Sequence, residues 1–172
     1  IKLDGNYPVG TGNVALGDAA FAGSLSGDSN VALGYQSHYS LTSGNANTSV
    51  GRGSGFSTTT GVSNVAVGYT ALASNTTASN NTAVGFQAGY NGTTEGNSVY
   101  VGRQAGYNAN GLFNTFVGNE SGLAVTSGVV NTFVGYDSGS SITTGSKNVI
   151  IGNYNGNEGG LDIRTSSNNI VL

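Results

Sequence analysis

The chain of 172 residues contains no cysteine, methionine or tryptophan, and only one proline and one histidine. Without cysteine it has neither a disulfide framework nor a thiolate metal site. Charged residues make up only 8% of the chain and leave a net charge of −3, whereas a nucleic-acid-binding protein needs a basic surface. No apolar run approaches about 18 residues, so we expect no membrane span. What the chain does have in excess is glycine, with 30 copies.

The glycines recur with a fixed period, because the pentapeptide Asn-x-x-aliphatic-Gly is repeated along the whole chain. Successive copies are 17 residues apart, except that one interval is 16 residues. The glycines that close the pentapeptides are Gly17, Gly34, Gly51, Gly68, Gly85, Gly102, Gly118, Gly135 and Gly152. A further copy begins at Asn169. A register held this long indicates a repeat protein in which each copy is one structural unit.

A unit of this length is too short for a helical-hairpin repeat or a propeller blade. Its Val and Thr residues favour strands, and its glycines favour corners. The sequence therefore predicts an all-β protein, a parallel β-solenoid (β-roll) of about nine to ten coils with two short strands per coil. We expect an N-terminal lead-in at 1–12, solenoid repeats at 13–160, and a final partial coil at 161–172 that leads out of the shaft.

The two faces of the predicted strand carry different side chains. The second and fourth residues of each pentapeptide share one face, and the third residue points the other way. Because the fourth residue is always aliphatic, we expect its face to be the buried one. The third residue becomes large and apolar at Tyr100, Phe116, Phe133 and Ile150, and exposed apolar surfaces mark interfaces. These four residues are the expected subunit interface; the alternative is a coil that buries both faces itself.

Identical positions stack into ladders in a solenoid. The opening asparagines form an expected structural ladder, in which side chains hydrogen-bond along the column: Asn13, Asn30, Asn47, Asn64, Asn81, Asn114, Asn131 and Asn148. The column after the main glycine carries aromatic and arginine residues: Tyr35, Tyr69, Phe86, Tyr136, Arg52 and Arg103. Such residues are typical of contact sites, so this column is the candidate ligand surface; a purely structural role is the alternative.

Few residues suggest chemistry, and we expect no catalytic, cofactor or metal site. His38 has no catalytic companions and is expected to be a surface residue at a corner. Glu120 and Asp137 stand in successive copies of one column, which a solenoid brings together. Adjacent carboxylates can hold Ca²⁺ or act as a glycosidase pair, although two solvated acids on a ridge are the simpler interpretation.

The repeat resembles the head repeats of the trimeric autotransporter adhesins, the YadA-like group. The stretch NTAVGFQAGYN at 81–91 is similar to repeats of bacteriophage tail fibres, and LDIRTSSNNIVL at 161–172 is similar to the segment that such fibres carry before a C-terminal chaperone domain. This resemblance implies a parallel homotrimer, a left-handed coil and a surface fibre that attaches to a host. The repeat here is longer than the usual YadA head repeat. Because the pattern stops within a copy, we expect a segment of a longer protein.

The expected function is that of a structural and adhesive fibre module, extracellular, on a virion tail or a cell surface. Its expected partners are other copies of itself and a host glycan or protein receptor, with no nucleic acid and no cofactor. Two alternatives remain open. A threonine column suggests an ice-binding solenoid, although its adjacent threonines do not share one strand face. The Glu120 and Asp137 pair suggests a polysaccharide-degrading tailspike.

Overall fold

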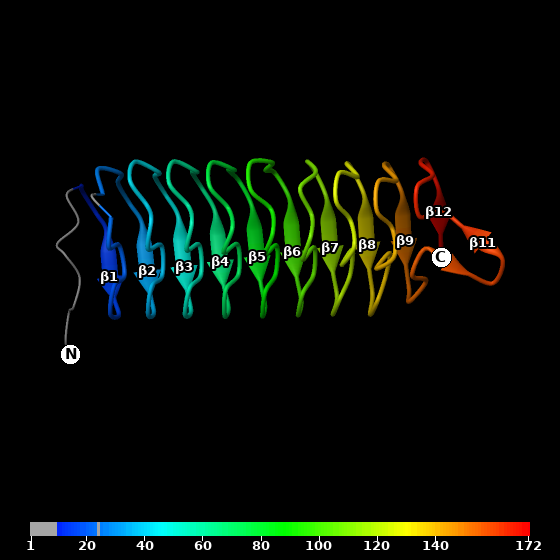
Figure 1. The fold of residues 1–172 in the computed structure, drawn as a ribbon, viewed down its shortest axis with the longest axis horizontal. Coiled ribbons are helices and arrows are strands. Elements are labelled where there is room, and N and C mark those ends of the chain that lie inside the picture. The colour runs from blue at the N-terminus through cyan, green and yellow to red at the C-terminus, as the bar shows by residue number, and fades with distance from the viewer. Residues whose placement is uncertain (1–9, 24) are drawn as a thin grey trace.

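The computed structural model describes residues 10–23 and 25–172 and shows a rod of stacked coils (Figure 1). Ten strands form one sheet in chain order, each paired in parallel with the next. The strands are β1 (Val14–Leu16), β2 (Val31–Leu33), β3 (Thr48–Val50), β4 (Val65–Val67), β5 (Thr82–Val84), β6 (Val99–Val101), β7 (Thr115–Val117), β8 (Thr132–Val134), β9 (Val149–Ile151) and β12 (Ile170–Val171). The described residues contain no helix, so the predicted all-β parallel solenoid is confirmed.

The strands pair in the register that the repeat predicts, with Val14 opposite Val31 and Thr82 opposite Val99. The last coil is longer than the others and projects a hairpin, β10 (Asn157–Glu158) paired antiparallel with β11 (Leu161–Asp162), at the C-terminal end of the rod (Figure 1). The expected boundary between 160 and 161 therefore falls in the turn of this hairpin. Most of the expected lead-in at 1–12 lies outside the described residues.

Apart from the last coil with its hairpin, each full coil contains one strand of three residues, and turns complete the rest of its circuit. The prediction of two strands per coil is therefore wrong. The predicted glycine corners are confirmed. At Gly51, directly after β3, φ is +128°, and a Cβ would lie 2.6 Å from the carbonyl oxygen of Gly68 in the next coil. Glycine is required there both for its backbone conformation and because the coils approach so closely.

The strand faces are the reverse of the expectation. The third residue of each pentapeptide points into the solenoid, and Phe116, Phe133 and Ile150 are 0% exposed within a single chain. Tyr100 is buried as well. These four residues are therefore not a subunit interface, because no surface of theirs remains for a second chain to cover. They form the core of the C-terminal half, where Phe116 and Phe133 stack with ring centroids 4.9 Å apart.

In most coils a large interior side chain comes either from the strand or from the turn opposite it, and residues further along the coil, such as Leu41, Val125 and Ile142, add to the core. We number the repeat from its opening residue, so position 3 lies on the strand and position 9 on the turn opposite it. Where position 3 is Ala15 or Ala66, position 9 is Phe21 or Leu72, and all four side chains face this core. Where position 3 is an aromatic residue, position 9 is glycine. The sequence interpretation placed position 3 on the outer face because position 4 is aliphatic in every copy, and it did not anticipate this exchange.

Candidate functional site

The asparagine ladder runs through the interior along the described coils. In its middle, the Asn47 backbone N–H and side-chain amide both donate to Asn30 Oδ1, at 2.9 and 3.1 Å, and its amide also donates to the Gly61 carbonyl at 2.8 Å. Asn64 repeats this pattern one coil further on. Ser98 replaces asparagine once and preserves the chain of bonds through its hydroxyl, which accepts from the Asn114 N–H. The ladder joins neighbouring coils through these buried hydrogen bonds.

The candidate ligand surface is brought together as one exposed column at position 6. The Arg52 guanidinium lies 5.6 Å from the ring centroid of Tyr35 and 5.3 Å from that of Tyr69, and it donates a 2.6 Å hydrogen bond to the Tyr69 hydroxyl. Phe86 stacks on Tyr69 at 5.5 Å, and Arg103 continues the column beyond it. Tyr136 stands further along and is 63% exposed. The column presents flat rings and cationic groups to solvent in a fixed order.

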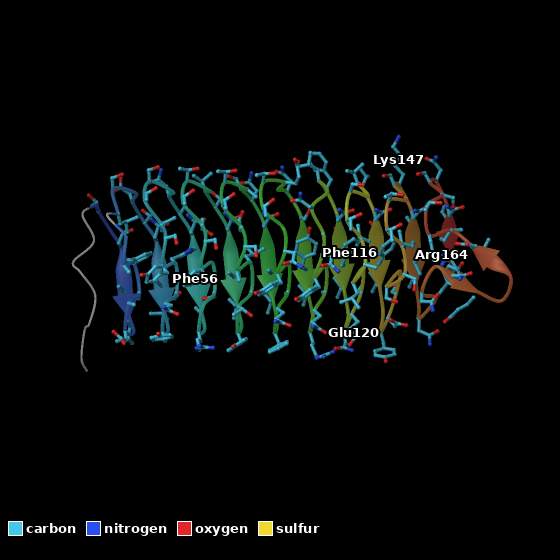
Figure 2. The ribbon with its side chains drawn as sticks, viewed as in Figure 1. Phe56, Phe116, Glu120, Lys147 and Arg164 are labelled. Carbon is cyan, nitrogen blue, oxygen red and sulfur yellow. The ribbon has the colours of Figure 1, made fainter. Side chains whose placement is uncertain are left out.

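The two carboxylates at position 7 have different surroundings. Glu120 forms an ion pair with Arg103 of the preceding coil and lies at one edge of the rod (Figure 2). Asp137 occupies the same column one coil further on. Within residues 10–23 and 25–172, no three metal-ligating side chains of His, Asp or Glu gather at one place. Because Glu120 is already neutralised by an arginine, this pair is poorly suited to hold a cation.

His38 lies inside the solenoid, so the expectation of a surface corner is wrong. It occupies position 9, stacks on Phe21 at 6.0 Å and is 1% exposed. Nδ1 lies 3.4 Å from the Gly55 carbonyl oxygen, whereas Nε2 and the nearby core hydroxyls of Ser49 and Thr58 have no hydrogen-bond partner. Burial lowers the pKa of His38 to about 4, and the Gly55 hydrogen bond offsets only part of that effect. The imidazole is therefore neutral at physiological pH.

The aliphatic stripe that was expected to be buried instead forms the outer surface of the sheet. We call it the sheet face: Val14, Leu16, Val31, Leu33, Thr48, Val50, Val65, Val67, Thr82, Val84, Val99, Val101, Thr115, Val117, Thr132, Val134, Val149 and Ile151. Every one of these residues is partly or fully exposed, with Leu16 at 41% and Ile151 at 52%. The face carries no charged residue. The repeat spacing identified its members, but not the side on which they lie.

Two hollows lie on the surface outside the sheet face. The larger, about 460 Å³, is beside the C-terminal hairpin and includes Asp162 and Arg164, which form an exposed ion pair at 2.8 Å. Hydrogen bonds from Arg164 lower the pKa of Asp162 to about 2. The smaller hollow, about 200 Å³, spans the second to fifth coils, with Phe56 and Tyr90 in its lining. Sequence reasoning missed both, although the second coincides with a break in an aromatic column.

No family model, no curated protein and no solved structure matches the chain. In the described part of the chain, no helix is long and apolar enough to cross a membrane.

Proposed function

We propose that the chain is a structural and adhesive segment of an extracellular fibre, carried on a virion or a cell surface, that assembles from identical copies. The observation that carries this proposal is the sheet face. It runs the length of the rod, consists of aliphatic and threonine side chains, and remains exposed in the single chain. Extended uncharged apolar surfaces of this kind mark protein interfaces.

The occupant of the sheet face is a second and a third copy of the same chain. Its aliphatic columns repeat at the coil spacing of about 4.8 Å, so an identical parallel rod offers matching side chains at every coil. A partner without this repeat would match the face at only a few coils. Three rods packed on these faces would bury them at a common axis, in keeping with the homotrimer that the resemblance implies. The position 6 column would then remain outside for contact with a host glycan or protein receptor.

An ice-binding role is the second candidate, and the exposed sheet face favours it more than the threonine column at position 13 does. That column consists of Thr42, Thr59, Thr76, Thr93, Thr126 and Thr143. The hydroxyls in that column are already engaged, since Thr59 Oγ1 donates to the Thr76 carbonyl and Thr76 Oγ1 to the Thr93 carbonyl. On the sheet face, threonine appears at Thr48, Thr82, Thr115 and Thr132, and aliphatic residues fill the other positions. This composition favours packing against protein. Thermal hysteresis in solution would overturn that preference.

Sedimentation velocity of the purified chain tests the proposal directly. We expect a single species with the mass of three chains that persists on dilution to the micromolar range and has β-type circular dichroism. A folded monomer under these conditions would contradict assembly through the sheet face. Turnover of a polysaccharide in a glycan-degradation screen would instead favour the tailspike alternative, which requires a working carboxylate pair.

A further inference from the structure

The hollow of about 200 Å³ lies where the aromatic column at position 10 is interrupted. In this column Tyr39 stacks on Phe56 with ring centroids 5.0 Å apart, and Tyr90 stacks on Tyr107 at 5.1 Å. Between the two pairs stands Ala73. Backbone hydrogen bonds show that no coil is skipped, because the Ser57 N–H donates to the Ala73 carbonyl and the Ser74 N–H to the Tyr90 carbonyl. One ring is therefore missing from an otherwise continuous stack.

A second small residue makes this hollow deeper. Gly53 occupies position 7, where neighbouring coils carry Gln36 and Thr70, and a Cβ added there would meet only the Thr70 methyl group, at 3.2 Å. Gly53 and Ala73 thus form the floor of the hollow, and Phe56 and Tyr90 stand on either side of it. We call this arrangement the ring slot.

We propose that the ring slot binds one hexopyranose ring, sandwiched between Phe56 and Tyr90. One coil separates stacked rings by about 5 Å in this column, so two coils separate the facing rings by roughly 10 Å. A flat aromatic ligand needs only about 7 Å, two contacts of roughly 3.5 Å. A puckered sugar ring is thicker and presents C–H groups on both faces, which the negative faces of the aromatic rings attract.

The rim supplies hydrogen-bonding groups for sugar hydroxyls. Gln36, Ser57 and Ser74 line the hollow, and Arg52 adds a cationic donor at its edge. Thr70 also lines it, and its Oγ1 is buried without a hydrogen-bond partner. A volume of about 200 Å³ is smaller than the roughly 300 Å³ minimum for sites that take drug-sized ligands, which limits the slot to about one ring. A longer glycan would extend from it over the exposed position 6 column.

This inference rests on the attachment role proposed above and deepens it by naming a ligand class. The test uses saturation-transfer difference NMR with the whole chain and a panel of methyl hexopyranosides and methyl N-acetylhexosaminides. We expect transfer to the ring C–H protons of at least one glycoside. Ala73→Tyr restores the missing ring with a residue the column already uses, and should abolish the signal while the chain stays folded. Tyr90→Ala removes one wall and should weaken binding about tenfold.

Phe113→Ala is the control, because it removes an exposed aromatic ring that does not line the slot and should leave binding unchanged. Binding that survives Ala73→Tyr, or a panel in which no glycoside binds, overturns the proposal. Binding of indole in the slot without any sugar overturns the ligand class. Sedimentation of the same samples separates the two proposals: a trimer that binds no sugar removes the ring slot alone, and a sugar-binding monomer removes the assembly alone.

Discussion

The ring of Phe116 fills the space that a side chain at Gly122 would need. A Cβ placed on Gly122 would lie 2.5 Å from Cδ2 of Phe116, and Gly139 has the same relationship to Phe133. In the first, second and fourth coils the arrangement is reversed, with Phe21, His38 or Leu72 on the turn and alanine on the strand. In these coils the backbone position that supplies the large side chain changes between the strand and the turn. Two other coils, with Ser49 and Gly55 or Ala83 and Gly89, supply none at either position, and side chains of neighbouring coils reach into that space.

Because the large core side chain comes from position 3 in some coils and from position 9 in others, a second substitution should restore stability lost at the first position. Phe116→Ala leaves a cavity and should lower the free energy of unfolding by about 3–5 kcal/mol. Gly122→Leu alone should also destabilise, because its side chain collides with the ring. The double variant reproduces the Ala66 and Leu72 pair of the fourth coil and should recover at least half of the loss caused by Phe116→Ala. Urea unfolding followed by circular dichroism measures all three. A double variant no more stable than Phe116→Ala would contradict the shared-volume interpretation.

The asparagine ladder predicts a large cost when one amide nitrogen is replaced by a carboxylate oxygen. Asn64→Asp removes the amide that donates to Asn47 Oδ1 and to the Ala78 carbonyl, and places a carboxylate against that carbonyl. We expect a loss of about 3 kcal/mol in the free energy of unfolding at neutral pH. Asn45→Asp is the matched control: Asn45 is exposed, uses its oxygen to accept from the Asp28 N–H, and shares its column with Asp28. Equal losses in the two variants would contradict a role for the buried ladder.

His38 predicts a pH dependence of stability. Its pKa is about 4 in the folded chain and about 6.5 when unfolded, so the unfolded chain binds the proton more readily. The free energy of unfolding therefore includes a contribution from neutral His38 that is fully present above about pH 6.5. This contribution, roughly 3 kcal/mol in total, is lost as the pH falls toward 4. Phe21, Ser49 and Gly55 lie next to the imidazole ring of His38, and none of them is charged.

Equilibrium unfolding measured between pH 7 and pH 4 should show this loss in the wild type. His38→Leu places at this turn the residue that the fourth coil carries there, Leu72, and should remove most of the pH dependence. If both proteins lose the same stability over this range, carboxylates rather than His38 are responsible.

The sheet face predicts that one charge separates the subunits without unfolding them. Val84 lies on β5 near the middle of the face and is partly exposed in the single chain. Val84→Lys would bring three ammonium groups together at a shared axis, at a cost on the order of several kcal/mol. We expect sedimentation velocity to show monomer while circular dichroism keeps its β-type spectrum. Thr144→Lys, an exposed change outside the sheet face, should remain assembled, and dissociation of both variants would argue against this interface.

The coil architecture was predictable because it depends on spacing. A glycine that recurs every 17 residues, as from Gly34 to Gly51, fixes both the coil length and the register of the parallel sheet. The asparagine ladder was predictable for the same reason, since one residue type at one position per coil must stack. Spacing does not reveal which face of a three-residue strand points inward, because period-2 alternation is the same for both choices.

Which strand face points inward depends on the space inside the closed coil, and the spacing of the repeat does not show that space. Ala32 was assigned to the outer face because the fourth residue of every copy is aliphatic, yet it is 0% exposed and packs in one core cluster with Phe21 and Leu41. Valine and leucine looked like inner residues, yet Val84 and Leu16 face outward. The ring slot could not be found from any single column of the repeat, because it depends on Gly53 and Ala73, which belong to different columns and adjacent coils.

The hydrogen bonds that join one coil to the next also determine how the rod responds to force. These bonds, from the Asn47 amide to Asn30 Oδ1 and throughout the sheet, connect only neighbouring coils. Tension applied to the two ends of one chain is therefore borne first by the terminal coils, which peel away singly while the rest stay intact. Each coil that opens releases roughly 50 Å of extended chain. Under such a load the rod lengthens stepwise, by one coil at a time.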